Sequence, residues 1–128
     1  MSAPLEGLRI LDFSTLLPGP FATMMLGDLG ADVIHVESPN RMDLVRLMPP
    51  YANGQATAHS YLNRNKRSVT LDLKQPESLA HIHRLLADYD IVVEQFRPGV
   101  MARLGLDYDA LKAINPGLIY CSITGYGQ

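Results

Sequence analysis

The chain has 128 residues, of which 47% are apolar and 19% charged, a composition typical of a globular domain with its own core and not of a disordered segment. Its net charge of −2 argues against nucleic acid as a partner, because nucleic-acid binders usually carry a clear basic excess. There is no apolar run of membrane length and no signal-type N-terminus, and the single Cys121 cannot form an internal disulfide, so we expect a cytoplasmic protein with no membrane partner. The four histidines show no metal-ligand spacing with Cys121, and no metal site is expected.

The first 37 residues predict a strand, a turn, a helix and a second strand. Residues 8–13 are a short, mostly apolar run typical of a buried strand, and Pro18-Gly19-Pro20 ends it. Apolar residues then recur at helical spacing from 21 to 29, Gly30 suits the C-terminal cap of a helix, and residues 32–37 form another strand-like run. This order is the opening of a parallel α/β sheet.

Between residues 38 and 61 the periodicity is lost, which marks a long loop of the kind that is usually functional or mobile. After it, the sequence predicts strands at 69–73, 91–94 and 118–123, a helix that begins at Pro76, a short helical turn between 98 and 105, and a helix from 107 to 114. The alternation predicts one domain, residues 1–128, built as a Rossmann-like open parallel sheet with helices on both faces. Because the chain stops as it enters the loop after the last strand, we expect the domain to be truncated at its C-terminal end.

Three cations, Arg64, Lys66 and Arg67, fall within four residues just before the strand predicted at 69–73. A compact cationic turn at a strand edge suits a phosphate or a diphosphate, because arginine offers a rigid fork for phosphate oxygens and lysine a mobile point charge. The alternative is a set of solvated cations that only keep a loop soluble. Charge alone leaves both interpretations open.

Five blocks of sequence follow one another along nearly the whole chain. They are residues 4–13, residues 18–20 with 26–34, Asn65-Lys66-Arg67-Ser68 with residues 71–74, residues 94–105, and Gly125-Tyr126-Gly127-Gln128. Together they resemble the class III CoA-transferase family, which includes formyl-CoA transferases, carnitine CoA-transferases and α-methylacyl-CoA racemases. The order and the spacing of the blocks carry the resemblance, since each block alone is a weak signal.

The resemblance implies that coenzyme A, as an acyl-CoA substrate, lies across this domain. Its 3′-phosphate and diphosphate need cations and free backbone N–H groups. Matched residue by residue, the implied CoA contacts are Leu16 and Leu17 at the thioester end, Asn65, Lys66 and Arg67 along the groove, Gln95 and Phe96 beside the nucleotide, Arg103 at the diphosphate, and Arg97 as either a ligand contact or a solvated cation. Many members have asparagine at the position of Gln95, and arginine at the position of Ser38, where Arg41 is the candidate to replace it.

The resemblance also implies the reaction. In the transferases an aspartate attacks the thioester, and CoA moves between carboxylic acids through an aspartyl intermediate. In the racemases, the alternative, the equivalent aspartate and a histidine exchange the α-proton of the acyl-CoA. Both residues lie beyond the Gly-Tyr-Gly-Gln motif, so no catalytic residue is predicted within 1–128. A third possibility is an inactive, truncated CoA-binding module. Full-length family members are interlocked homodimers, and the implied partners are an acyl-CoA and a carboxylic acid.

Several other side chains have a structural interpretation beside the functional one. Asp12 is either part of a site at the end of the first strand or a cap of the next turn, and His59 is expected at the surface although it could reach an acyl group. The remaining residues are expected to be structural: Phe21, Met24 and Met25 in the core, Cys121 as an inert buried thiol, and His81 and His83 on different faces of a helix.

Overall fold

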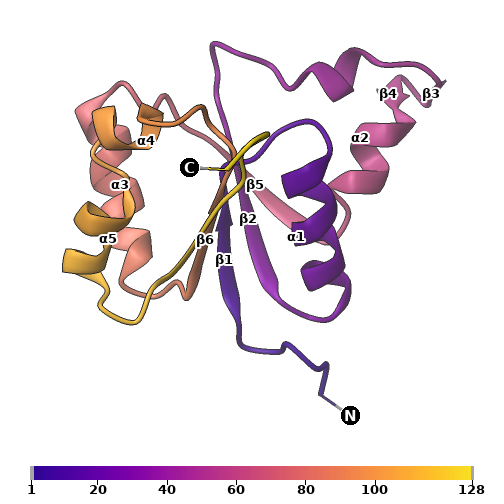
Figure 1. Ribbon diagram of the computed structural model, residues 1–128. Helices are drawn as coiled ribbons and strands as arrows, with labels where there is room; N and C mark the ends of the chain where they lie inside the picture. The colour runs from indigo at the N-terminus through magenta and orange to yellow at the C-terminus, as the bar shows by residue number, and fades with distance from the viewer. Residues whose placement is uncertain (1, 128) are drawn as a thin grey trace.

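A computed structural model describes residues 2–127 of the chain and shows an open parallel sheet between two layers of helices (Figure 1). The five strands lie in the order β5-β2-β1-β6-β7, and every neighbouring pair is parallel. Helix α1 covers one face, and helices α3, α4 and α5 cover the other (Figure 1). The predicted Rossmann-like fold is therefore confirmed, with β1 at the centre of the sheet.

The elements of the sheet and of its covering helices follow the predicted order closely. Their bounds are β1 (Arg9–Asp12), α1 (Pro18–Asp28), β2 (Asp32–Glu37), β5 (Lys66–Thr70), α3 (Pro76–Leu86), β6 (Ile91–Glu94), α4 (Val100–Arg103), α5 (Tyr108–Ile114) and β7 (Ile119–Ser122). Proline stands in the first turn of both α1 and α3, where its missing N–H has no hydrogen bond to lose. The Asp107 carboxylate accepts a hydrogen bond from the Ala110 N–H and caps α5.

The segment between β2 and β5 contains more structure than its missing periodicity predicts. It holds a 3-10 helix, η1 (Leu44–Leu47), a short hairpin of β3 (Tyr51–Ala52) and β4 (Gln55–Ala56), and helix α2 (Thr57–Leu62). These elements lie at the end of the molecule that carries the loops after β1 and β2 (Figure 1). Each element is too short to show a period in the sequence, which explains why the prediction missed them.

The prediction of a strand at 69–73 is wrong by three residues. The ladder with β2 begins at the pair Val33 and Lys66 and ends at the pair Glu37 and Thr70. The apolar alternation at 69–73 suggested the later position because Leu71 and Leu73 still pack against the core after the strand has ended. Lys66 and Arg67 therefore lie within a strand, where successive side chains point to opposite faces, and not in one compact turn.

Two apolar clusters form the core, one on each face of the sheet. Leu11, Ile82, Leu86 and Leu111 are fully buried between the sheet and the helices α3 and α5, whereas a smaller cluster that includes Ile10 and Val33 lies on the face of α1. Alternation along β1 thus sends successive residues to different clusters. Burial on both faces is the usual reason that parallel strands have almost continuous apolar sequences.

Three side chains predicted to be buried are exposed. Phe21 and Met25 lie on the outer surface of α1 together with Leu17 and Leu29, and only Met24 is in the core. Cys121 is exposed because β7 is an edge strand and the cluster on the α1 face does not reach across it. Within residues 2–127, no helix is long and apolar enough to span a bilayer, and no three His, Cys, Asp or Glu side chains are grouped as metal ligands.

Candidate functional site

The carboxyl ends of the five parallel strands meet at one edge of the sheet. In open parallel sheets ligands bind beyond this edge, at the point where the chain leaves neighbouring strands in opposite directions. Here that point lies between β1, which is followed by α1 on one face, and β6, which is followed by α4 on the other. The loop after β1 (residues 14–20, counted here with the first turn of α1) and the loop after β6 (residues 95–99) are the first candidates for a site.

Gln95 joins these two loops. Its side-chain carbonyl accepts a hydrogen bond from the Gly19 N–H at 3.2 Å, and its amide donates to the Thr15 carbonyl at 2.5 Å. A methyl group on Gly19 would collide with the Ser14 side chain and lie 2.8 Å from Gln95 Oε1, so this closely packed position accepts only glycine. The loop after β1 is therefore held in one conformation from the β6 side.

Leu16 and Leu17, predicted at the thioester end of CoA, lie at the tip of the same loop with 41% and 60% of their surface exposed. Leu16 has a φ of 63°, a left-handed conformation that costs energy for a residue with a side chain. Its N–H points at both carboxylate oxygens of Asp43, 3.3 Å from each. Asp43, which also caps η1, supports the strained residue from the segment between β2 and β5.

A buried group of polar side chains lies directly beneath the loop, and we call it the Asp12 cluster: Asp12, Ser14, Thr23, His35 and Lys66. Asp12 and Thr23 are fully buried. One Asp12 oxygen, Oδ1, accepts hydrogen bonds from the Ser14 N–H at 2.9 Å and from the Ser14 hydroxyl. The other, Oδ2, accepts from the Thr23 hydroxyl at 2.5 Å and from Lys66 Nζ at 3.1 Å. His35 Nδ1 lies 3.7 Å from the same Oδ2 atom.

The pKa of Asp12 is set by two opposing causes. Burial raises it, but His35, the charge of Lys66 and the Ser14 hydrogen bond together lower it from 3.8 to about 2. Burial lowers the pKa of Lys66, and its interactions with Asp12 partly oppose that shift. Asp12 is therefore ionised at neutral pH, and its ion-pair partner is Lys66, with Nζ 3.1 Å from Oδ2.

This pair predicts a particular acid sensitivity. A folded-state pKa below the unfolded value contributes stability above about pH 4, and that contribution disappears as the pH falls through about 2. Its size is about 2 kcal/mol. An NMR titration of the side-chain carboxyl carbons should give an Asp12 midpoint near pH 2, and a midpoint near 4 would contradict the buried pairing.

A cavity of about 260 Å³ opens beside the cluster, at the carboxyl end of β2. His35 lies in its wall, and neither ring nitrogen has a hydrogen-bond partner among residues 2–127, although Nε2 is 3.9 Å from Glu37 Oε1. Glu37 itself accepts hydrogen bonds from Arg46 and Ser68. The lining residues are Thr15, His35, Glu37, Ser38, Pro39, Arg41, Met42, Asp43, Arg46 and Thr70.

His59, expected at the surface, is half-buried in α2, and burial lowers the pKa of its imidazole.

A second cavity, of about 360 Å³, lies on the other side of β6. Phe96 and Arg97 line it together with Met101 of α4 and Tyr108 and Tyr120. Phe96 is half-buried against the core, and its N–H donates to the Glu94 carboxylate at 2.8 Å. The two cavities therefore lie on either side of the carboxyl ends of β1 and β6.

Each of the three cations of the predicted turn forms an ion pair with a carboxylate. Arg64 forms a 2.6 Å ion pair with Asp28, and Arg67 forms a 2.6 Å ion pair with Asp32 at the start of β2. Lys66 is directed inward to Asp12. The Asn65 side chain donates to Asp28 at 2.9 Å. The backbones of these four residues lie before or at the start of β5, and only the Lys66 side chain extends to the carboxyl end of β1, where it is buried against Asp12. The contacts of all four with CoA stay predictions.

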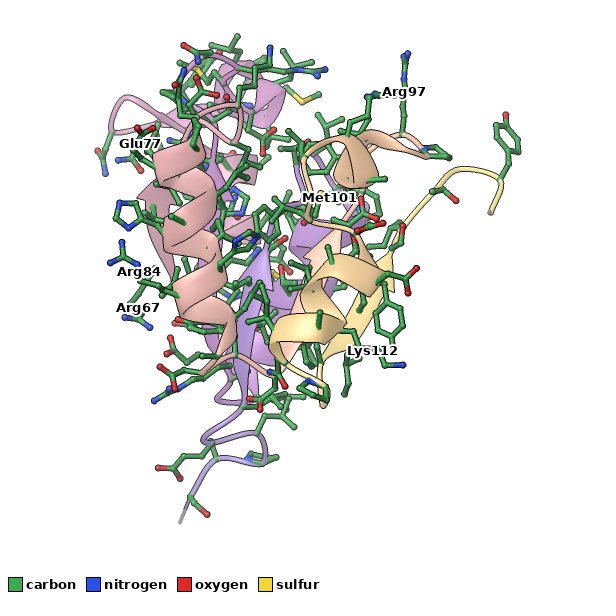
Figure 2. All side chains as sticks on the ribbon, turned by 90° about the vertical axis from the view of Figure 1, so that its left-hand side faces the viewer. Arg67, Glu77, Arg84, Arg97, Met101 and Lys112 are labelled. Carbon is green, nitrogen blue, oxygen red and sulfur yellow. The ribbon has the colours of Figure 1, made fainter. Side chains whose placement is uncertain are left out.

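Five other cations have side chains that form no hydrogen bond or ion pair within the part of the chain that the structure describes: Arg41, Lys74, Arg97, Arg103 and Lys112. The first four follow the carboxyl end of a strand, Arg41 after β2, Lys74 after β5, and Arg97 and Arg103 after β6. Lys112 lies in the last turn of α5, with its ammonium group 5.3 Å from the centre of the Tyr108 ring. Figure 2 shows Arg97 extending from the end of the molecule opposite the N-terminus, whereas Arg67 lies along α3. Four of these five cations, and so most of the unpaired positive charge of the described residues, lie at the carboxyl edge.

The structure brings together six of the nine predicted contact residues. Leu16, Leu17, Gln95, Phe96, Arg97 and Arg103 share the carboxyl edge. Sequence reasoning missed Lys74 and Asp43 as site residues. Lys74 ends the recognisable string 71–74, which could have identified it, but nothing in the sequence links Asp43 to Leu16.

An open parallel sheet with unpaired cations and a fixed loop at its carboxyl edge defines a Rossmann-like domain, a class that binds its ligands at that edge. Residues 5–128 match the family described as CoA-transferase family III. The chain belongs to this family, and the resemblance seen in its sequence blocks is confirmed.

Two curated relatives and two solved structures illustrate the similarity. The chain is 48% identical to the succinyl-CoA:glutarate CoA-transferase of Mus musculus and 43% identical to the acetyl-CoA:oxalate CoA-transferase of Acetobacter aceti, in each case over 98% of its own length. It spans 29% and 32% of those proteins. A CAIB/BAIF family protein from Brucella suis matches 99% of this chain with a TM-score of 0.91 and 45% identity, over 35% of its own length. A hypothetical protein (Rv3272) from Mycobacterium tuberculosis matches 98% with a TM-score of 0.89 and 44% identity, also over 35% of its own length.

Proposed function

We propose that these residues form the CoA-binding domain of an acyl-CoA:carboxylate CoA-transferase. The reaction moves CoA between two carboxylic acids through an aspartyl intermediate, and the aspartate lies beyond residue 128. The observation that carries the proposal is the placement of Arg41, Lys74, Arg97 and Arg103: four of the five cations without a hydrogen bond or ion pair among the described residues lie where a parallel sheet binds its ligand. Membership of the CoA-transferase family indicates that the anion bound there is CoA.

The chemistry of CoA fits this edge. Its phosphates need several charge-assisted hydrogen bonds, and the unpaired arginines can supply them without first breaking an internal ion pair. Its acyl-pantetheine arm is largely uncharged and needs a narrower, partly apolar path, which the exposed Leu16 and Leu17 offer beside the Gln95 bridge. Asn65, Lys66 and Arg67 remain in the proposal as contacts implied by the family resemblance.

Transfer of CoA is preferred to racemisation because the similar proteins are named as CoA-transferases. Their names also contain small dicarboxylic acids, and we propose a carboxylic acid of this kind as the acceptor. We also propose that the full-length protein is a homodimer, as the family resemblance implies. Without the aspartate, the 128-residue chain is expected to bind CoA but not to turn it over.

The test is calorimetric titration of the chain with CoA. We expect a measurable affinity that weakens as salt concentration rises, because exposed cations hold the phosphates. The double variant Arg97→Gln/Arg103→Gln should weaken binding by about tenfold or more, as expected for lost hydrogen bonds between charged groups. Arg84→Gln is the control, since Arg84 is an exposed cation on α3 that faces away from the carboxyl edge (Figure 2).

Two results would contradict the proposal. A wild-type chain that retains its fold and shows no heat of binding with CoA would exclude this domain as a CoA site. Equal affinities of the double variant and of Arg84→Gln would move the phosphate site away from the loop after β6. A titration with pantetheine, which lacks the nucleotide and its phosphates, tests whether the phosphates contribute to binding. We expect pantetheine to bind much more weakly than CoA.

A further inference from the structure

The Asp12 carboxylate contacts several separate elements without reaching the surface. Four donors converge on it, and they come from the loop after β1, from α1 and from β5. Asp12 has no exposed surface, so it cannot touch a ligand bound at the carboxyl edge. A carboxylate that only capped the next turn would need the Ser14 contacts alone. The additional partners indicate a larger role.

These partners hold both ends of the loop. At its start, Ser14 donates its N–H and its hydroxyl to Asp12. At its end, the Thr23 hydroxyl lies between Asp12 and the Gly19 carbonyl, at 2.5 Å and 3.1 Å. Lys66 Nζ likewise donates to Asp12 and, at 3.0 Å, to the Pro20 carbonyl. The loop between Ser14 and Pro20 is therefore fastened at both ends to one buried carboxylate.

We propose that Asp12 is a positioning residue for the proposed CoA site: it fixes the loop of residues 14–20 from beneath and so places Leu16 and Leu17 at the carboxyl edge. The inference rests on the proposed function for the identity of the ligand. It differs from the binding contacts given above because Asp12 acts only through the loop. It also gives Lys66 an internal role, as the cation that allows this carboxylate to be buried.

Geometry requires a carboxylate at this position. Oδ1 accepts two hydrogen bonds and Oδ2 accepts two more. Asparagine has the same shape, but in either orientation of its amide the NH₂ group would face a group that can only donate, the Ser14 N–H or the Lys66 ammonium. Either the Ser14 N–H or Lys66 Nζ must then lose its hydrogen bond to residue 12, whichever way the amide turns, and the negative charge is lost as well. Asp12→Asn is therefore a sharp test that changes charge and hydrogen bonding while keeping volume.

The experiment measures amide hydrogen exchange of the 128-residue chain by NMR, with CoA affinity measured on the same samples. In Asp12→Asn we expect the amides of Ser14, Leu16 and Gly19 to exchange at least about tenfold faster relative to core amides such as Val93, because local opening becomes easier than global unfolding. CoA affinity should fall by about tenfold. Asp90→Asn is the matched control: Asp90 also accepts a backbone N–H, from Arg9, at the opposite end of β1.

A second, less disruptive variant tests the inference if Asp12→Asn does not fold. Thr23→Val removes only one hydroxyl from a buried site of the same shape, and it should speed exchange at Gly19 while leaving Ser14 unchanged. The inference is overturned if loop and core amides accelerate equally, which would mean a purely structural role. It is also overturned if the loop opens and CoA affinity stays the same. A wild-type chain without CoA affinity refutes the proposed function instead, and the exchange ratio still decides whether Asp12 fixes the loop.

Discussion

Lys66→Met is expected to lower the free energy of unfolding by about 3–5 kcal/mol, because it leaves the Asp12 carboxylate buried without its counter-charge. The Lys66 side chain has 1% of its surface exposed and Asp12 has none, so solvent cannot compensate. Methionine fills a similar volume, which limits the loss to charge and hydrogen bonding. Urea unfolding followed by circular dichroism measures the change.

Arg67→Met is the control for this variant. Arg67 is the next residue of β5 and forms an ion pair of 2.6 Å with Asp32, but the two side chains are 64% and 40% exposed. Exposed pairs contribute about 0–1 kcal/mol, so this variant should unfold almost like the wild type. If both variants lowered the free energy of unfolding by the same amount, the prediction that the buried pair contributes more stability than the exposed pair would be wrong.

Ile82→Ala is expected to cost about 2–5 kcal/mol, the usual range for a large buried aliphatic side chain cut back to a methyl group. Ile82 is fully buried on α3, where it belongs to the same cluster as Leu11, Phe13 and Val36. The cavity left behind would lie against β1, the strand that carries Asp12 at its end. Thermal unfolding measured by calorimetry gives the size of the effect.

Leu79→Ala, one turn earlier on the same helix, is the control for this variant. It separates the stability lost with buried surface from any change in helix propensity. Leu79 is only partly buried against the cluster, and we expect a loss of about 1 kcal/mol. Alanine is a good helix former at both positions, so propensity changes little. A larger loss for Leu79→Ala than for Ile82→Ala would contradict the position of the core described above.

Much of the fold could be predicted from the sequence because its strands are buried and its helices have clear beginnings. Strand β2 and helix α5 begin and end where the sequence predicts. Strand β5 was misplaced because its own residues, Lys-Arg-Ser-Val-Thr, are mostly polar, as an edge strand permits. Phe21 and Met25 were misplaced for a related reason, since apolar spacing along α1 does not show which of its sides meets the sheet.

The site was predictable only in part. The loops after β1 and β6 follow from the fold class and from the sequence blocks of the family, and they contain five of the predicted contacts, while Arg103 ends the adjoining helix α4. The pairing of the cations could not be predicted, because Asp12 and Lys66, or Asp28 and Arg64, are brought together only by the order of the strands. A run of cations in a sequence therefore does not reveal which charges remain available to a ligand. Arg97 and Arg103 keep their charge free, whereas Lys66 does not.

The central position of β1 has a consequence for how the chain acquires its structure during synthesis. Ile10 pairs with Val33 on one side and with Ile91 on the other, so the first strand to leave the ribosome needs a partner made much later. Contacts of such long range slow folding, because a large loop must close before they form. A nascent chain that has not yet reached Lys66 holds the Asp12 carboxylate without a counter-charge, and burial of β1 is then unfavourable. Stable burial of β1 therefore depends on β5 for the counter-charge of Asp12, as well as on β2 and β6 for backbone pairing.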